Sequence, residues 1–596
     1  MTTANESGSF RDSAAGFKGV WPRDFPLAAP AADRITPEPM EVAQQDPLKD
    51  RAVGNLQNKA ARRASGIRPN WLRLSHEHTA FSATILLMAS TMLSRVIGLV
   101  RVKVIAYLFG AGSLTDAYNA AFQLPDMLTY LLVGGTASIT FITILSRYRE
   151  QGREHEGEQA LSVILSVMLL VLGAAVLFGE VFAPFYTRTF FPGFDTEKAA
   201  LCTHMTRILL PAQLCFFVGG VLAAALLVRK QFAWQAVSSL FYSLGIIMGG
   251  VLLHKYLGIS SLAVGAVAGV IAGPLLLNYV GTRRIGLRLR FSLQLSHPGL
   301  REWIRLSVPL MIGVSLVTAD TWILSYFASE GRGEISKLLY AKTLFTAPMA
   351  MLGQAAGAAS MPFFAALAGQ KKFSDFALAV NRTVTRIFAF AFLLSAWMIG
   401  LSHPAVELVL RGGLFSHSDV GQTAVFFTLF AGSLCFWSAQ AIYARAFYAA
   451  GNTLTPMTAS TLVTVASIPV YWLLFHHLGA RGLAIASDCG IVVQTLALAG
   501  LLHAKGLVRW SGLEFSELTR ALGAALLGFA ALNGVLRILP APPIYWARDL
   551  VQIVCGTLAW FGAAWFVLHL TGSHLPQQLT RRFRHRDAAG APPIAS

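Results

Sequence analysis

The feature that most constrains this chain is a series of apolar stretches, each long enough to cross a lipid bilayer, between residues 79 and 571. A transmembrane helix needs about 20 largely apolar residues to cross about 30 Å of hydrocarbon. The pattern therefore predicts about 14 membrane-spanning helices. We expect them near residues 80–109, 116–145, 161–187, 205–228, 231–254, 259–281, 302–328, 335–367, 384–410, 421–448, 455–477, 480–504, 518–538 and 548–570.

The overall composition agrees with an all-α integral membrane protein. Of 596 residues, 55% are hydrophobic and 13% are charged, whereas soluble proteins carry about 25% charged residues. The net charge is +18. The basic residues lie in short segments between the apolar stretches rather than in one continuous patch, which argues against a nucleic-acid partner. The five cysteines form no CxxC pair and no zinc-ligand spacing, so no metal site is predicted.

Lys and Arg are concentrated in alternate loops, for example at 147–153, 229–230 and 283–290. Such residues favour the cytoplasmic side of a membrane. The pattern predicts that both termini are cytoplasmic. Residues 1–78 contain no segment that resembles a signal peptide and are expected to form a disordered cytoplasmic extension. Residues 572–596 are expected to form a basic cytoplasmic tail.

Two segments of the chain resemble each other. Residues 116–148 contain a Leu-Pro pair followed by a run of small residues, and residues 339–367 contain an Ala-Pro pair followed by a similar run. Each lies in the second helix of a predicted six-helix block. A repeat after six spans keeps its orientation, so its pseudo-two-fold axis runs along the membrane normal. We therefore predict two six-helix lobes, 79–281 and 282–504, followed by two further helices within 505–571.

Charged side chains inside the first predicted helix need a physical explanation. Arg95, Arg101 and Lys103 lie within 80–109, and an Arg at the bilayer centre costs at least about 2.5–3.5 kcal/mol on insertion scales. One interpretation is that they line a polar, anion-binding cavity between the lobes. The other is that they pair structurally with Asp116 or Asp126.

A second cation, Lys342, is expected to face this cavity from the second repeat and to meet a ligand phosphate, Asp116 or Asp126 there. Further ionisable residues in apolar stretches are Asp320, Glu407, Arg445 and Asp488. No catalytic motif is present: there is no HExxH, GxSxG or Walker sequence, and His417 and the pair His476–His477 have no obvious partners. A transporter that does not itself hydrolyse ATP is therefore favoured over an enzyme.

Four motifs resemble those of a known family. The segments are Ser94–Arg101, Phe109–Tyr118, Phe122–Pro125 and Arg445–Pro456. The first three resemble the start of the lipid II flippase family (MurJ/MviN), within the multidrug/oligosaccharidyl-lipid/polysaccharide exporter superfamily. The fourth resembles the link between helices 10 and 11 of that family. The resemblance covers roughly residues 80–570.

The resemblance implies a bacterial cytoplasmic-membrane protein that moves lipid II, an undecaprenyl-diphosphate carrying a sugar–peptide headgroup, by alternating access. Arg95 and Arg101 match arginines thought to hold the diphosphate or headgroup, for which the bidentate guanidinium is suited. Asp116 matches an aspartate of the family and is assigned to substrate on that ground. The full set of candidate substrate-binding residues is Arg95, Arg101, Lys103, Asp116, Asp126 and Lys342. Helices 518–538 and 548–570 would form a groove for the polyprenyl tail. No cofactor is implied, and the driving force is left between the membrane potential and a monovalent cation.

The chain departs from the family at several charged positions. Tyr130 and Gly134 stand where the family has an arginine and an acidic residue, and Lys342–Thr343 stands where it has Asp-Arg. These differences leave open a flippase for another polyprenyl-linked glycan or a non-transporting scaffold for envelope assembly. A cation-coupled drug exporter, which has 12 helices, is disfavoured by the last two helices, and a membrane glycosyltransferase by the lack of catalytic carboxylates. The oligomeric state is not predicted.

Overall fold

The computed structural model of this protein describes residues 80–128, 134–287, 289–312, 316–539, 542 and 544–575. All of them belong to the second of two units into which contacts divide the chain, Pro69–Ser596. Nearly all lie in helices, and the one strand-like pairing among them is an isolated bridge between Gly412 and Phe415. The all-α prediction is thereby confirmed. The predicted extension 1–78 lies outside the described residues, as does most of the predicted tail 572–596.

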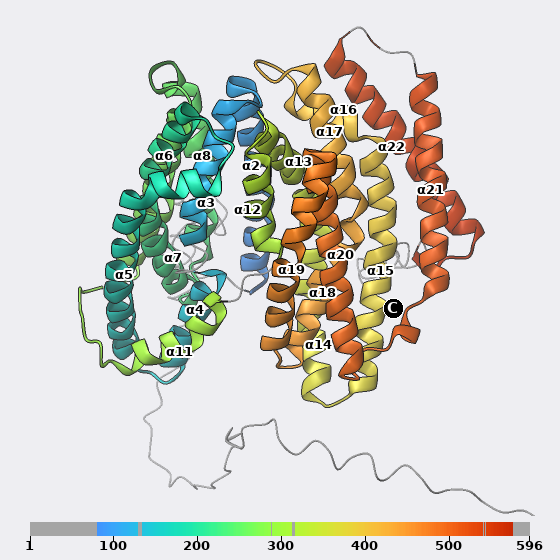
Figure 1. The fold of residues 1–596 in the computed structure, drawn as a ribbon. Coiled ribbons are helices and arrows are strands. Elements are labelled where there is room, and N and C mark those ends of the chain that lie inside the picture. Colours follow the sequence, from blue (N-terminus) through green and yellow to red (C-terminus); the bar gives the residue numbers. More distant parts are fainter. Residues whose placement is uncertain are drawn as a thin grey trace, which may run out of the picture. The chain divides into compact units, whose positions relative to one another are not determined.

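The first helical bundle occupies the left side of Figure 1. Its elements are α2 (Ala80–Phe109), α3 (Ser113–Leu128), α4 (Gly134–Glu150), α5 (Glu154–Phe190), α6 (Thr196–Leu209), α7 (Ala212–Val228), α8 (Phe232–Leu257), α9 (Ser260–Val270) and α10 (Asn278–Arg284). The π-helical segment Ile271–Leu277 joins α9 to α10. Within the bundle, α8 packs against α2 and α9, α3 against α6, and α4 against α7.

Glycines allow α8 and α9 to lie very close together. A Cβ atom added to Gly249 would lie 2.5 Å from the carbonyl oxygen of Ser261, and one added to Gly265 would lie 2.4 Å from that of Gly245. Within a membrane, burial from water does not drive one apolar helix onto another. Helix pairs are therefore held by close van der Waals contact between small residues, as in this pair.

The second bundle lies on the right side of Figure 1. Its elements are α12 (Leu316–Ala328), α13 (Glu334–Met349), α14 (Ala355–Gly369), α15 (Phe373–Gly400), α16 (Ser402–Leu410), α17 (His417–Gly432), α18 (Leu434–Ala449), α19 (Leu454–Leu478) and α20 (Ala480–Ala504). After a short 3-10 turn at Trp510–Gly512, the last helices are α21 (Phe515–Ile538) and α22 (Tyr545–Leu570). These two pack on each other, and they contact the second bundle through α15 and α16.

The two described parts of the predicted span 302–328 pack on different bundles. α11 (Pro298–Ile312) packs against α4 and α5. An ion pair of 2.5 Å between Arg147 Nη2 and Glu302 Oε1 adds to this contact. α12, in contrast, packs against α19 and α20. The start of the predicted second lobe, 282–504, therefore contains a helix that packs with the first bundle.

The number of spans differs from the prediction. By length and composition, ten helices of the described part are able to cross a membrane, or eleven if α17 and α18, which are bent by 45°, form one span. The count of 14 is not confirmed. The predicted span 384–410 differs in its bounds, because α15 already ends at Gly400 and Ser402–Leu410 forms a separate helix.

Each of the two repeat segments contains a proline within a helix. α3 contains Pro125, its described part runs to Leu128, and α4 is described from Gly134. α13 contains Pro348, and the π-helical segment Ala350–Gln354 then leads into α14. A proline removes one backbone hydrogen bond and distorts the helix around it. Both segments share a proline inside a helix, and the repeat itself stays a prediction.

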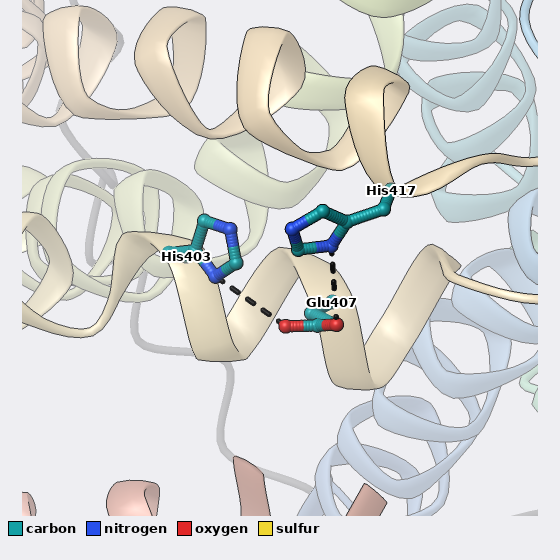
Figure 2. A group of neighbouring side chains, drawn as sticks. All are labelled: His403, Glu407 and His417. Atoms are coloured by element: carbon teal, nitrogen blue, oxygen red, sulfur yellow. Dashed lines mark ion pairs between the residues drawn. The ribbon is translucent and has the colours of Figure 1, made fainter. Parts of the chain in front are cut away.

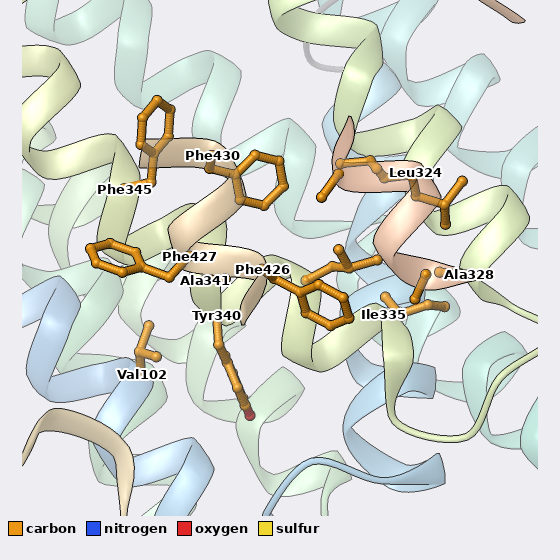
Figure 3. Packing of buried hydrophobic residues seen from close by; sticks show 14 of the residues in the cluster. Val102, Leu324, Ala328, Ile335, Tyr340, Ala341, Phe345, Phe426, Phe427 and Phe430 are labelled. Atoms are coloured by element: carbon orange, nitrogen blue, oxygen red, sulfur yellow. The ribbon is translucent and has the colours of Figure 1, made fainter. Parts of the chain in front are cut away.

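An apolar cluster joins the two bundles. It includes Val102 on α2 of the first bundle together with Tyr340 and Phe345 on α13 and Phe430 on α17 of the second. Figure 3 shows part of this cluster, in which the ring centres of Phe345 and Phe430 are 6.0 Å apart. The core between the bundles is therefore continuous on one side of the cavity described next.

Candidate functional site

The candidate site is a cavity of about 430 Å³ between the two bundles. Helices α2, α3 and α8 of the first bundle line it, together with α12 and α13 of the second. Three of the predicted site residues lie in its wall, Arg101, Asp126 and Lys342. The structure thus brings together one cation from each bundle, Arg101 from the first and Lys342 from the second.

Arg101 forms no ion pair with a described residue, although the Asp126 carboxylate in the same cavity wall interacts with it electrostatically. Its Nη1 atom lies 3.5 Å from Ser243 Oγ on α8, and its Cζ atom lies 5.8 Å from the centre of the Tyr242 ring. These contacts hold the side chain against α8. The other N–H groups of the guanidinium are left for an anion in the cavity, and Arg binds phosphate oxygens in a bidentate manner.

Arg95 is placed differently from Arg101. It lies earlier on α2, is partly exposed, and is absent from the cavity wall. It forms no hydrogen bond or ion pair with other described residues, so the predicted alternative, pairing with Asp116 or Asp126, is not seen in the described part of the chain. Its role in anion binding stays a prediction.

Lys342 pairs with a different carboxylate from those expected. The sequence suggested Asp116, Asp126 or a ligand phosphate, but its Nζ atom pairs with Asp320 of α12 and lies 2.9 Å from Thr321 Oγ1. Asp320 is fully buried and also accepts a hydrogen bond from the Tyr471 hydroxyl. The ammonium still faces the cavity, but its charge is compensated within the second bundle.

Asp116 lies outside the cavity wall and connects the two bundles. Its Oδ2 atom accepts from Lys198 Nζ at 3.1 Å and from the backbone N–H of Gly333 at 2.6 Å. Its Oδ1 atom accepts from the backbone N–H and the hydroxyl of Ser336, at 2.9 and 2.7 Å. Both oxygens of this buried carboxylate are therefore used by the protein, and the predicted substrate contact is untested.

Lys103 also points away from the cavity. Its Nζ atom donates to the carbonyl oxygen of Arg411, at 2.5 Å, in the turn between α16 and α17. In the same region the backbone N–H of Leu414 donates to Tyr107 O at 3.0 Å. Together with the Asp116 contacts, these bonds define what we call the closed end, where the bundles meet.

Glycine is required in this turn at the closed end. Gly413 has φ +56°, a left-handed conformation that other residues rarely adopt, and an added Cβ would lie 2.0 Å from Tyr107 O. Sequence reasoning missed both this glycine and Ser336, because a contact between bundles leaves no periodic signal in the sequence.

An apolar groove of about 230 Å³ lies beside the last helix. Its wall is almost entirely apolar and includes Phe390 and Leu393 of α15 with Trp560, Phe561 and Trp565 of α22. The prediction was that the last two helices would form a groove for the tail. One of them, α22, lines this groove together with α15, and its use by a tail stays a prediction.

Comparison with known proteins gives consistent results. The family described as "Lipid II flippase MurJ" matches residues 105–546. A probable lipid II flippase MurJ of Thermotoga maritima is 26% identical over 428 residues, which is 70% of this chain and 86% of the relative. The lipid II flippase MurJ of Burkholderia cenocepacia is 24% identical over 502 residues, 82% of this chain and 96% of the relative.

Solved structures share the fold. One described as lipid II flippase MurJ in an inward closed conformation has a TM-score of 0.68 at 21% identity, covering 81% of this chain and 99% of that chain. An inward-facing multidrug resistance MATE family transporter of the MOP superfamily has a TM-score of 0.54 at 15% identity, covering 71% and 98%. The arrangement of helices is therefore that of a transporter fold.

Proposed function

The chain belongs to the MurJ family of lipid II flippases, and from this premise we propose that it translocates lipid II across the cytoplasmic membrane by alternating access. It acts as a transporter rather than an enzyme. The substrate is an undecaprenyl-diphosphate that carries a peptidoglycan precursor.

The cavity between the bundles is the observation that carries this proposal. A diphosphate brings at least two negative charges, and its binding in a membrane requires cations and hydrogen-bond donors. Arg101 offers guanidinium donors that are in no ion pair among the described residues, and Lys342 adds an ammonium from the facing bundle. Asn119, Gln123 and Thr343 supply neutral polar groups for a sugar–peptide headgroup.

The closed end supplies one half of an alternating-access cycle. The positive-inside bias predicts that α2 and α15 end at the outer face, so the turn between α16 and α17 is external and the closed end is the outer gate. Opening this gate requires that Asp116 leave the donors of Gly333 and Ser336. The headgroup would then exit outward while both termini remain in the cytoplasm.

The polyprenyl tail needs an apolar path that stays in lipid. The groove between α15 and α22 fits this need, because its wall consists of aromatic and aliphatic side chains. Burying an isoprenoid chain against such a wall gains about 25 cal/mol per Å² of apolar area only where the tail would otherwise meet water. In lipid, the groove therefore acts chiefly by orienting the tail.

A flippase for another polyprenyl-linked glycan is the second candidate. One observation favours it: the Lys342 charge is compensated by Asp320, and Thr343 stands where the resembling family has an arginine. The diphosphate would be shared by both substrates, and the headgroup would differ.

Complementation tests the proposal. We expect the chain to restore growth in bacteria depleted of their own lipid II flippase, and Arg101→Ala to fail although it inserts normally. Asp419→Asn, outside the cavity, is the matched control and should complement. Failure of the unaltered chain at normal membrane abundance would contradict lipid II transport and favour the second candidate.

A further inference from the structure

A cluster of potential metal ligands lies at the closed end, away from the cavity. His403 and Glu407 stand one helical turn apart on α16, and His417 is the first residue of α17 (Figure 2). No obvious partner for His417 could be identified from the sequence, and the structure now places it beside Glu407. Glu407 is fully buried, whereas the side chains of His403 and His417 are 46% and 62% exposed.

The turn between the two helices fixes the position of His417. A bridge between Gly412 and Phe415 closes the turn. Ser416 then caps α17 in a capping box with Asp419, in which the Ser416 hydroxyl lies 3.2 Å from the Asp419 backbone N–H. This arrangement presents the His417 ring to the carboxylate of Glu407. The ring centres of His403 and His417 are 5.5 Å apart.

The three side chains of this cluster are close enough to reach one metal ion, with the two imidazoles next to different oxygens of Glu407. His403 Nδ1 lies 3.4 Å from Glu407 Oε2, and His417 Nδ1 lies 3.5 Å from Glu407 Oε1. All three ligand atoms lie within 4.8 Å of one another. Zinc–nitrogen and zinc–oxygen bonds of about 2.0–2.2 Å place tetrahedral ligands roughly 3.3–3.5 Å apart.

We propose that His403, Glu407 and His417 form a binding site for a divalent transition-metal ion such as Zn²⁺. Two imidazoles and one carboxylate are a ligand set that suits zinc, which takes such ligands in tetrahedral geometry. The exposure of both imidazoles leaves the fourth position to water.

Two arginines already pair with Glu407, so a metal ion bound to this carboxylate would lie close to two positive charges. Arg411 pairs with Oε1, and Arg548 Nη2 lies 2.6 Å from Oε2. A metal ion next to two guanidinium groups would be repelled, so binding requires that at least one of them move. The metal and Arg548 therefore compete for the same carboxylate.

Arg548 has an alternative partner next to it. Its Nε and Nη2 atoms both lie 3.2 Å from Oδ1 of Asp549, which is fully buried. The other oxygen of this carboxylate, Oδ2, has no hydrogen-bond partner in the described part of the chain. Arg548 would gain a bidentate contact there when it leaves Glu407. Arg411 would keep its contact with the Tyr545 ring, 4.6 Å from its Cζ atom.

The metal would link α16 to α17 beside the closed end. The turn that it would stabilise also holds the bonds from Lys103 to Arg411 O and from Leu414 to Tyr107 O. At the same time Arg548 would release α16 from the start of α22. Metal binding should therefore favour the state in which the two bundles are joined at the closed end.

Calorimetric titration of the tag-free, full-length protein with Zn²⁺ tests this proposal. Loss of an outer-shell partner of a metal ligand typically weakens metal affinity about 10- to 100-fold. Loss of a ligand itself should weaken zinc binding by at least this factor. We expect this for both His403→Ala and His417→Ala. The matched control is His476→Ala with His477→Ala, a histidine pair at the end of α19 with ring contacts but no carboxylate in the described part. It should keep the site.

Two further measurements make the result specific. Co²⁺ bound to the unaltered protein should show the strong visible absorption of four-coordinate cobalt, and His417→Ala should abolish it. Arg548→Gln removes the competing cation, so it should tighten zinc binding. Unchanged zinc affinity in both histidine variants would overturn the site, and unchanged or weaker affinity in Arg548→Gln would overturn the exchange with Asp549.

Discussion

The contacts of Asp116 across the bundles allow a quantitative test of the outer gate. Asp116→Asn keeps the size of the side chain but removes its charge and one acceptor oxygen. The NH₂ group then faces the donors of Gly333 or Ser336, which lie 2.6–2.9 Å from the carboxylate. In the unaltered protein, the ion pair between Asp116 and Lys198 lies within the first bundle. It is present whether the gate is open or closed, so its loss in the variant does not shift the balance between these two states.

The magnitude follows from the bonds that cross between bundles. At least one hydrogen bond to a charged acceptor is lost, which is worth about 1.5–3 kcal/mol. The ratio of open to closed molecules should therefore rise roughly 10- to 10²-fold, since 1.4 kcal/mol corresponds to a factor of ten. If almost all molecules of the unaltered protein are closed, closed molecules remain the majority in the variant.

Thiol labelling measures this ratio. Thr343→Cys places a thiol in the cavity wall, and its rate of reaction with a membrane-impermeant maleimide from outside is proportional to the open fraction. We expect Asp116→Asn to raise this rate roughly 10- to 10²-fold. The control is Asp375→Asn, an exposed carboxylate in the first turn of α15, at the opposite end of that helix from the closed end. Equal labelling rates in the two variants would refute the role of Asp116 as a gate.

The remaining predictions concern the cavity, the second bundle, helix packing and topology. Arg101→Lys should translocate little lipid II, because an ammonium does not reproduce bidentate pairing; translocation by the variant at the unaltered rate would contradict this. Lys342→Ala leaves Asp320 buried without its cation and should lower the free energy of unfolding by about 3–5 kcal/mol, whereas adding Asp320→Asn should recover part of it in thermal denaturation. Gly265→Leu should separate α8 from α9 and reduce the folded yield, because an added Cβ already meets backbone at 2.4 Å. A reporter fused after Arg290 should be cytoplasmic and one after Gly331 external, and the opposite pattern would reverse the gate.

The sequence was sufficient for the fold class because periodic apolar runs and loop charges are local signals. The helical membrane fold and the placement of Arg101 in a cavity wall both follow from such signals. The break between α15 and α16 did not, since Leu401 is as apolar as its neighbours and hydropathy continues through it.

The partners of the charged residues were harder to predict. Lys342 was expected to meet an anion of the first bundle, but Asp320 lies on the adjacent helix α12 and its second oxygen is held by Tyr471. Which carboxylate an ammonium meets depends on the rotation of each helix about its axis. Similarly, Asp116 was assigned to substrate from the resemblance, whereas its surroundings depend on Ser336, a residue distant in the sequence.

The most direct test of the central claim is the amount of lipid II exposed at the outer leaflet. In cells depleted of their own lipid II flippase, an enzyme added outside the membrane should cleave lipid II when this chain is produced. It should not do so when Arg101→Ala is produced at equal abundance. If lipid II stays protected with the unaltered chain, or is cleaved equally with Arg101→Ala, then lipid II transport through this cavity is contradicted.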